Sequence, residues 1–535
     1  MSSVQRSRDS KNKRTDFWVI KHKKTERKEK KMVQKPVIFP LDGYMKAHQA
    51  LFDFRSILRE PGMKELISFA KGNDLFHCDD MPGPAVMKAL GKIAIEENTD
   101  VGIFLDLKLA DVKNTDMNTA RHYADSFPGK GIITISDKVN GEGFLYVRRA
   151  LPNVKLALVS VLTDMKSEVC APRYGNYPDT EILHMVRCIQ SEYEKVRTEK
   201  DPKYAFDLIV CSANEVAFLR QVLGFIYGYI CPGIRDSWMT EGQQARTAGV
   251  KWALNQGATY LVMGAQMAKG NPEKGVTAEQ SRQMTIEEVK KSNYIEIIPS
   301  DPLATLTNCE GYYESPVDSD GKSKGPLVAY AGSYEVEEGK DKKKNLVGFV
   351  YFNFAKAEQY PLPRDYFARQ LAQVIVEQVG IPDVVIGAPM GGIMMAVEVG
   401  RILGCRTIFA EKKVIALADI KTGEKEQSEL IINRHDINPG DFVVIIEDVI
   451  NNLSTPKKMI GIINERDGNL LGIAAPFSRS QKTEWNELPV AAGTHKPLKQ
   501  FKQEDPVVAD LITAGYIVWS PKQQWAQLKE AMEEG

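Results

Sequence analysis

The sequence VGIFLDLK, at residues 101–108, is an apolar run of strand length that ends in charged residues. Side chains alternate between the two faces of a strand, so Asp106 and Lys108 are predicted to point the same way. Similar short runs recur about every 25 to 35 residues, with helix-length segments between them. This alternation indicates βα units arranged around a parallel sheet.

Eight such units precede residue 287. The predicted strands lie at 37–43, 65–71, 101–108, 131–136, 155–162, 206–212, 228–231 and 259–264. Eight βα units in about 250 residues is the size of a TIM (β/α)8 barrel, whose chemistry takes place at the carboxyl ends of its strands. We therefore predict an α/β TIM barrel over residues 36–286, with Asp106 and Lys108 at its catalytic end.

A second pattern follows the charged stretch at 287–300, which we interpret as a linker. It opens with two apolar runs, GPLVAYAGSYE and VGFVYFNF, which flank a lysine-rich loop and are typical of antiparallel strands. Alternating strands and helices come next, with strands predicted at 383–389, 406–412, 442–449 and 469–477. This pattern predicts an open, doubly wound α/β domain over residues 301–535.

The composition is that of a globular chain, with 535 residues of which 43% are hydrophobic and 26% charged. It excludes a disordered, collagen-like or disulfide-stapled protein. The net charge is zero, but residues 1–35 hold 13 basic and four acidic residues without a sustained apolar period. We predict a basic, disordered tail there, either an anchor to polyanions or a solubilising extension.

Seven cysteines are scattered along the chain without a CxxC pair. Neither a zinc site nor a disulfide framework is predicted, so a reducing, cytoplasmic location fits best. No apolar run is long enough to cross a membrane, and the basic amino terminus lacks the apolar core of a signal peptide. We expect no metal-ligand cluster, no membrane partner and no nucleic-acid partner.

The charged run around Asp106 extends into a longer motif. Asp106-x-Lys108-x-x-Asp111-Val112-x-Asn114-Thr115 resembles the signature of the orotidine 5'-phosphate decarboxylase family. Six further stretches resemble that family in the same order along the chain: 39–42, 71–74, 161–165, 210–215, 231–235 and 242–246. The resemblance therefore extends over the whole predicted barrel.

This resemblance implies decarboxylation without a cofactor. Lys71, Asp106, Lys108 and Asp111 would form a chain of alternating charges, in which Asp106 lies near the substrate carboxylate and Lys108 gives a proton to the pyrimidine carbon. Preorganised charge of this kind supplies much of the rate enhancement in many enzymes. Asp111 and Thr115 would come from the partner subunit, which implies a homodimer or a higher oligomer.

The resemblance also implies residues that bind the substrate. Asp42 would bind the ribose, and Gln243 would reach the pyrimidine and the phosphate. Gly264 ends the last strand, where the family has a Gly-Arg pair whose guanidinium binds the phosphate, but this chain has Ala265 next. The residues left to compensate are Arg235 and Lys269. A different alignment would put His77 in the place of Lys71.

The run VVIIEDVI, at 443–450, carries a second set of candidate residues. Two carboxylates at the end of a buried strand need ligands, because burying them without partners is unfavourable. The run resembles the fingerprint of the type I phosphoribosyltransferases, in which Glu447 and Asp448 would bind the ribose hydroxyls of phosphoribosyl pyrophosphate. Gly391 and Gly392 open a helix-like segment, whose free amides suit the pyrophosphate.

Further stretches resemble the orotate phosphoribosyltransferases in particular. Lys412 lies in a charged strand, and the segment around 419–425 would be a mobile loop over the site. Residues 311–313 and 351–356 resemble the hood that receives orotate, and 477–480 resembles a later Asp-Arg-Ser stretch. The family implies Mg²⁺, bound with phosphoribosyl pyrophosphate.

The phosphate loop departs from the transferase pattern. The family has a glycine-containing loop after the acidic pair, whereas this chain has Asn451-Asn452-Leu453-Ser454-Thr455. A leucine restricts φ and adds a side chain where backbone amides approach the phosphate. Two interpretations stay open, namely an active transferase and a domain kept for binding, regulation or assembly.

Together the two resemblances are those of the bifunctional UMP synthase family, with the decarboxylase domain first. In de novo pyrimidine biosynthesis, orotate and phosphoribosyl pyrophosphate give orotidine 5'-phosphate, which loses carbon dioxide to give UMP. One alternative is a decarboxylase with a degenerate transferase domain. Another is a non-catalytic pyrimidine-nucleotide sensor or scaffold.

Overall fold

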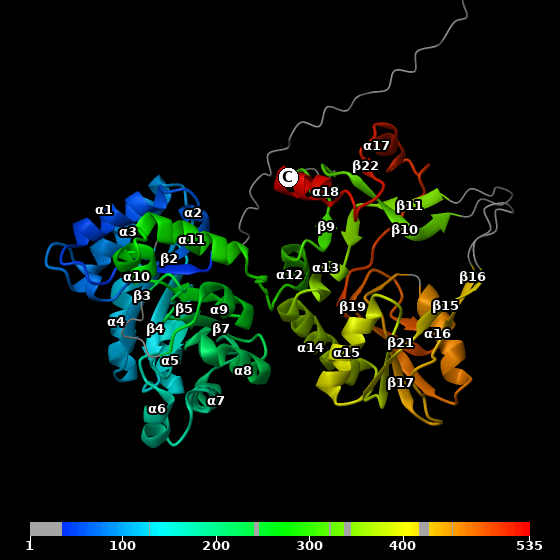
Figure 1. Ribbon diagram of the computed structural model, residues 1–535, viewed down its shortest axis with the longest axis horizontal. Coiled ribbons are helices and arrows are strands. Elements are labelled where there is room, and N and C mark those ends of the chain that lie inside the picture. The colour runs from blue at the N-terminus through cyan, green and yellow to red at the C-terminus, as the bar shows by residue number, and fades with distance from the viewer. Residues whose placement is uncertain are drawn as a thin grey trace, which may run out of the picture.

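Eight parallel strands close into a barrel in the first half of the chain (Figure 1). They are β1 (Val37–Pro40), β2 (Ile67–Gly72), β3 (Gly102–Leu109), β4 (Gly131–Ser136), β5 (Lys155–Val159), β6 (Leu208–Val210), β7 (Gly228–Cys231) and β8 (Tyr260–Val262). All eight predicted strands are present in the predicted order, so the TIM barrel is confirmed.

The computed structural model describes residues 35–127, 129–239, 246–319, 321, 323–335, 344–416, 427–451 and 453–534. The predicted basic tail therefore lies almost entirely outside the described residues.

Helices surround the barrel on its outside. They are α1 (Ala47–Leu58), α2 (Met63–Leu66), α3 (Gly83–Glu96), α4 (Lys113–Ala124), α5 (Gly141–Ala150), α6 (Ser167–Tyr174), α7 (Pro178–Val196), α8 (Ala213–Leu223), α9 (Val250–Gln256), α10 (Ala265–Ala268) and α11 (Ala278–Lys290), with short 3-10 helices at Asp74–His77 and Pro272–Lys274. One apolar core lies between strands and helices, and a second fills the barrel interior. Phe104 belongs to the interior core, so the strand's alternation directs Asp106, two residues later, to the same side.

The pairing of β3 with β4 is irregular exactly where the charged motif lies. Leu105 pairs with Ile133 and Leu109 with Ile135. The chain therefore advances four residues along β3 while it advances two along β4. Lys108, within this bulge, has a φ of 51°. Bulges of this kind often re-aim side chains next to active sites.

The second half contains a mostly parallel sheet in the order β14-β13-β17-β19-β21-β20. Its strands are β13 (Val384–Gly387), β14 (Arg406–Phe409), β17 (Phe442–Ile446), β19 (Asn469–Ser478), β20 (Glu484–Trp485) and β21 (Leu488–His495), with β18 (Val449–Ile450) paired to β19. Helix α14 (Pro361–Gln378) precedes β13, α15 (Gly392–Leu403) connects β13 to β14, and α16 (Ser454–Asn464) connects β18 to β19. The predicted doubly wound α/β fold is confirmed.

Smaller elements complete the second domain. They are α12 (Pro302–Asn308), β9 (Tyr312–Glu314), β10 (Leu327–Glu335), β11 (Lys344–Gly348), β12 (Val350–Phe352), α13 (Ala355–Glu358), β15 (Glu411–Ala416), β16 (Gln427–Ile431), α17 (Ala509–Thr513), β22 (Ile517–Val518) and α18 (Trp525–Glu534). The antiparallel pair expected at the start of the domain is β10 with β11. The sequence pattern does not predict β21 or the β15–β16 hairpin.

The two domains contact each other at the amino-terminal end of the barrel. Phe225, in the loop between α8 and β7, packs edge-to-face on Tyr366 of α14, with ring centroids 5.5 Å apart. Arg369 Nη2 donates a hydrogen bond to the carbonyl oxygen of Gln221 at 3.2 Å. The loop before a barrel strand lies opposite the carboxyl ends of the strands. The second domain therefore contacts the end of the barrel that does not carry the charged motif.

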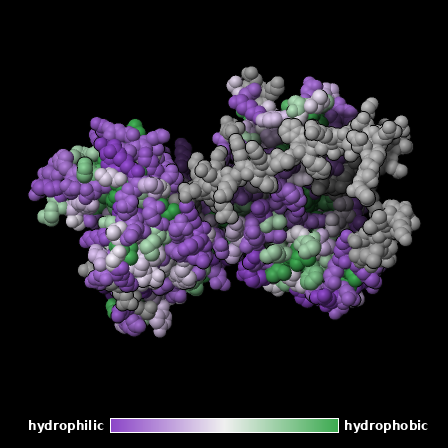
Figure 2. All heavy atoms as spheres, turned by 45° about the horizontal axis from the view of Figure 1, so that its top comes forward, coloured by the Kyte–Doolittle hydropathy of each residue, from purple (hydrophilic) through white to green (hydrophobic). Residues whose placement is uncertain are grey.

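The face of the molecule in Figure 2 is mainly hydrophilic, with a hydrophobic patch on the second domain. Exposed hydrophobic side chains of this domain include Met390, Met394 and Val397, on α15 and the loop before it. Among the described residues, no helix is both long enough and apolar enough to span a membrane.

Candidate functional site

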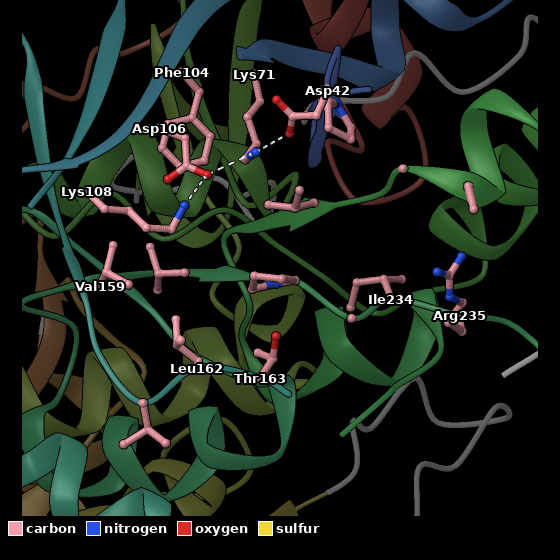
Figure 3. Close-up of a pocket in the computed structure, with 18 residues that line it drawn as sticks. Asp42, Lys71, Phe104, Asp106, Lys108, Val159, Leu162, Thr163, Ile234 and Arg235 are labelled. Atoms are coloured by element: carbon pink, nitrogen blue, oxygen red, sulfur yellow. Dashed lines mark hydrogen bonds and ion pairs between the residues drawn. The ribbon is translucent and has the colours of Figure 1, made fainter. Parts of the chain in front are cut away.

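A cavity of about 350 Å³ opens at the carboxyl ends of the barrel strands (Figure 3). Its lining residues come from the ends of seven of the eight barrel strands, all except β4, and from the loops after them: Pro40, Asp42, Lys71, Phe104, Asp106, Lys108, Val159, Val161, Leu162, Thr163, Val210, Pro232, Gly233, Ile234, Arg235, Val262, Gly264 and Ala265. Four charged groups gather at one end of it, Arg235 lies apart from them, and the rest of the lining is mostly apolar. This combination suits a ligand with a polar reactive part and a flat apolar face.

Four charged residues form a continuous chain in the cavity. Lys71 Nζ and Lys108 Nζ each lie 2.9 Å from Asp106 Oδ2. Lys71 also binds Asp42, at the end of β1. Figure 3 shows the four side chains in the order Lys108, Asp106, Lys71, Asp42, so that positive and negative groups alternate.

Pairing keeps these groups charged despite their burial. Burial alone would lower the pKa of Lys71, but Asp106 and Asp42 outweigh this effect and raise it. Burial would likewise raise the pKa of Asp106, but Lys71 and Lys108 bring it below its ordinary value. At neutral pH the cavity therefore holds a fixed anion between two ammonium groups.

The structure also places the other residues predicted for the barrel site. His77 is exposed and does not line the cavity, so Lys71 occupies the position in the chain of charges. Asp111 and Thr115 are exposed near the start of α4 and lie outside this cavity. Gln243 lies outside the described residues.

The far end of the cavity is formed by the loops after β7 and β8. Gly264, Ala265 and Arg235 all line it, with Arg235 at the opposite end from the charged chain in Figure 3. The buried Gln266 donates to Asp236 Oδ2 at 2.7 Å and accepts from the Asp236 backbone N–H at 3.0 Å. These bonds fix the backbone next to Arg235.

Two residues of the site are not identified by the sequence pattern. Asn73 donates its backbone N–H to Asp42 at 2.8 Å and its side-chain amide to the Asp106 carbonyl oxygen at 2.6 Å. Thr134, on β4, donates to Asp106 Oδ1 at 3.0 Å. Asn73 lies in a stretch already noted as family-like, but nothing in the sequence around Thr134 marks it.

In the second domain, the acidic pair follows β17 and faces the loop that opens α15. A Cβ atom added to Gly391 would lie 2.5 Å from the Asp448 carboxylate, and one added to Gly392 would lie 2.0 Å from the Ile446 carbonyl oxygen. Only glycine permits this close approach. The predicted pyrophosphate loop and the predicted ribose-binding carboxylates therefore lie against each other.

Burial disfavours the ionised form of both carboxylates in the acidic pair, Glu447 and Asp448. Burial raises the pKa of Glu447 to about 8, and the neighbouring Asp448 adds to the rise. Burial also raises the pKa of Asp448. Arg479 lies near Asp448, with its guanidinium 4.8 Å from the ring centroid of Tyr330. A bound cation or hydroxyl donor beside the pair would stabilise its charged form.

The raised pKa of Glu447 predicts how stability depends on pH. Between its ordinary pKa of 4.5 and about 8, the folded protein keeps a proton that the unfolded chain has lost. The stability of the second domain should therefore fall as pH rises through this window. Glu447→Gln, which cannot ionise, should flatten that fall. Thermal unfolding at pH 5 to 8.5 would check this, and identical profiles for both proteins would contradict it.

The predicted phosphate loop contains a leucine in a left-handed conformation. Leu453 has a φ of 58° and immediately precedes α16. Its side chain is buried in the apolar core of the sheet. The backbone thus adopts a conformation that favours glycine, at a cost of about 1–2 kcal/mol. Asn452, beside it, lies outside the described residues.

The remaining residues predicted for the second site are only partly described. Lys412 is exposed on β15, opposite Leu430 of β16. The proposed mobile loop at 419–425 lies outside the described residues. The two hood segments do meet, since β9 pairs antiparallel with β12 and places Tyr313 opposite Tyr351.

Comparisons with known proteins find relatives of two kinds. No protein-family model matches the chain. The chain aligns with the structure of Leishmania donovani UMP synthase over 94% of its own length and 98% of that chain, at 14% identity and a TM-score of 0.34. It is 34% identical over 131 residues to the orotate phosphoribosyltransferase of Heliobacterium modesticaldum, which is 24% of this chain and 62% of that protein.

The second kind of relative is a decarboxylase. The chain is 27% identical over 214 residues to the orotidine 5'-phosphate decarboxylase of Nitrosomonas europaea, covering 39% of this chain and 87% of that protein. The two families of relatives correspond to the two folds described above, a closed barrel and a doubly wound sheet. The chain thus has relatives among both the orotidine 5'-phosphate decarboxylases and the orotate phosphoribosyltransferases, the two enzymes that a bifunctional UMP synthase combines.

Proposed function

We propose that the second domain converts orotate and phosphoribosyl pyrophosphate to orotidine 5'-phosphate, and that the barrel decarboxylates this product to UMP. Relatives of both enzyme types support the two activities. The observation that carries the proposal is the alternating chain of Asp42, Lys71, Asp106 and Lys108 in one cavity. A protein that only sensed nucleotides would have no need of an ammonium group fixed between carboxylates.

In the barrel, the substrate carboxylate lies near Asp106, which destabilises it by like charge. The bond between the pyrimidine carbon and the carboxyl group breaks, and its electron pair stays on the ring carbon. Lys108 gives that carbon a proton from Nζ, and carbon dioxide leaves. Lys108 then regains a proton from water, so the step balances without a cofactor.

The remaining barrel residues bind the nucleotide. Asp42 accepts a hydrogen bond from a ribose hydroxyl. Gly264 lets the phosphate approach the backbone at the end of β8. Arg235, at the far end of the cavity, and Gln243 bind the phosphate and pyrimidine. Asp111 and Thr115 are exposed beside the start of α4, where a second copy of the chain has access to them. We therefore propose a homodimer or higher oligomer in which they complete the partner's site.

In the second domain, a ring nitrogen of orotate attacks the ribose carbon of phosphoribosyl pyrophosphate, the bond to pyrophosphate breaks, and the proton of that nitrogen passes to water. Glu447 and Asp448 accept hydrogen bonds from the ribose hydroxyls. The backbone amides around Gly391 and Gly392 bind the pyrophosphate. Lys412 offers a cation to the same leaving group. Arg479, a largely buried cation, suits the orotate carboxylate.

The second site fits Mg²⁺ bound together with the substrate. Carboxylate oxygens are the donors that Mg²⁺ prefers, and it is commonly held by one or two of them plus substrate phosphates. Burial raises the pKa values of both Glu447 and Asp448, so a cation would stabilise the charged pair. When bound, Mg²⁺ would supply charge neutralisation for the leaving pyrophosphate.

A second candidate function is decarboxylation alone, with a degenerate transferase domain. The loss of the family's glycine-containing phosphate loop, which here reads Asn451-Asn452-Leu453, favours it. The left-handed backbone and the buried side chain of Leu453 favour the active transferase instead, because they keep a backbone conformation that suits glycine. All seven cysteines carry free thiols, which supports a cytoplasmic location for either candidate.

Two assays on the purified full chain test these functions. Pyrimidine absorbance is followed first with orotidine 5'-phosphate alone, and then with orotate, phosphoribosyl pyrophosphate and Mg²⁺. Loss of absorbance in both assays is the result expected of a bifunctional enzyme. Loss in the first alone would leave a decarboxylase with a degenerate transferase domain, and no loss in either would leave the sensor or scaffold.

Replacing Ala265 by arginine tests whether the phosphate end of the cavity lacks a charge. Ala265 lines the cavity, so an arginine there should add a charge-assisted contact and lower the KM for orotidine 5'-phosphate roughly tenfold or more. Ala268→Arg is a matched control, because Ala268 lies on the same short helix but is exposed and does not line the cavity. An unchanged KM in Ala265→Arg would mean that Arg235 already suffices.

A further inference from the structure

Thr134 joins two parts of the charged motif through one buried hydroxyl. Its Oγ1 donates to Asp106 Oδ1 at 3.0 Å and accepts from the backbone N–H of Lys108 at 2.8 Å. The residue is completely buried on β4. It does not line the cavity, so it acts on the reaction only through Asp106 and Lys108.

The irregular pairing of β3 with β4 explains why a hydroxyl is needed there. Ladder pairing stops after Leu105 and resumes at Leu109, so the amide of Lys108 lies within the interruption. The Thr134 hydroxyl accepts a hydrogen bond from this N–H, where a regular ladder would have a strand carbonyl oxygen as the acceptor. It thereby stabilises Lys108 at a φ of 51°, a conformation that residues other than glycine seldom adopt.

The two oxygens of Asp106 have separate partners. Oδ2 lies 2.9 Å from both Lys71 Nζ and Lys108 Nζ, while Oδ1 accepts from Thr134. With Oδ1 held from β4, the carboxylate cannot rotate freely, and Oδ2 stays directed at the two ammonium groups. Without the Thr134 hydroxyl, the buried Oδ1 of Asp106 would lose this hydrogen-bond donor, which is energetically unfavourable.

We propose that Thr134 is a positioning residue of the decarboxylase, which sets the placement of the proton donor Lys108 relative to the anion Asp106. The proposal rests on the decarboxylase function proposed above. Misplacing reacting groups by about 1 Å can cost roughly 100-fold in rate, so loss of the hydroxyl should act on turnover more than on substrate binding.

Two substitutions at the same position separate this role from simple packing. Thr134→Val keeps the shape of the side chain and removes the hydroxyl, whereas Thr134→Ser keeps the hydroxyl and removes a methyl group. Positioning predicts that kcat falls roughly 10- to 100-fold in Thr134→Val, with KM changed by less than about threefold, and that Thr134→Ser retains most of the wild-type kcat. A packing role predicts the reverse order.

Steady-state decarboxylation of orotidine 5'-phosphate by the full chain is the measurement. Equal kcat values for the valine and serine variants, or a change confined to KM, would overturn the proposal. If Thr134→Val does not fold, Thr134→Ser and Thr134→Ala make a second pair that differs only in the hydroxyl. An inactive wild-type protein would instead contradict the decarboxylase function itself, so the two failures are distinguishable.

Thr305→Val provides a matched control in the second domain. Thr305 is also completely buried, and its hydroxyl accepts from the Ile298 backbone N–H at 2.8 Å. The substitution removes a comparable hydroxyl, so it should leave the kcat of decarboxylation unchanged. A loss there equal to that of Thr134→Val would show that the effect is not specific to the site.

Discussion

Replacing Lys108 by alanine is expected to reduce decarboxylation of orotidine 5'-phosphate by about two to four orders of magnitude, the usual contribution of a positioned general acid. Lys108 is the proton donor in the proposed step, and it also pairs with Asp106 at 2.9 Å. Its loss removes the proton and leaves Lys71 as the remaining ammonium partner of Asp106. Turnover of orotidine 5'-phosphate measures the effect, and the transferase reaction of the same protein should keep its rate.

Lys130→Ala is the control for this variant. Lys130 lies next to β4, and its Nζ pairs with Asp100 at 2.9 Å, away from the cavity. The same change of residue type should therefore leave turnover unchanged. If Lys108→Ala keeps more than about a tenth of the wild-type rate, Lys108 is not the general acid.

Asp448→Asn is expected to reduce the transferase reaction by about two to three orders of magnitude and to leave decarboxylation unchanged. Asparagine keeps the shape that packs against Gly391 but removes the charge that would face the ribose and Mg²⁺. Because burial raises the pKa of Asp448, the anion is unfavourable in the free protein. The variant should thus be at least as stable as the wild type, which separates loss of function from unfolding.

Asp510→Asn makes the same change at an exposed position on α17 in the same domain. It should affect neither reaction. Initial rates with orotate, phosphoribosyl pyrophosphate and Mg²⁺ give the comparison for both variants. Equal damage to both reactions by Asp448→Asn would contradict two independent sites.

The sequence was informative about the fold wherever hydrophobic periodicity was strong. The eight barrel strands and β13, β14, β17 and β19 are apolar runs of strand length, and all of them form. β21 was not foreseen, because Leu488–His495 contains Pro489 and Gly493, and its hydrophobic pattern is weak. The β15–β16 hairpin was not foreseen, because the charged strand with Lys412 was predicted to end there and the segment after it was interpreted as a loop.

The candidate site could be predicted only as far as residues adjacent in sequence determine it. Alternation along a strand placed Asp106 and Lys108 together, but it contains no information about the bulge or the φ of Lys108. Thr134 contacts Asp106 across 28 residues of sequence, so only the closed barrel reveals it. A leucine at position 453 is expected to restrict φ and to add a side chain beside the phosphate, whereas Leu453 adopts the left-handed conformation and buries its side chain in the core.

The packing of Phe225 on Tyr366 also bears on how the shared intermediate travels. Because this contact lies at the amino-terminal end of the barrel, the catalytic cavity faces away from it. Orotidine 5'-phosphate released by the second domain must therefore cross water to reach a barrel entrance. Its capture depends on local concentration near the molecule and not on an internal passage. The barrel that captures it can belong to a different copy of the chain.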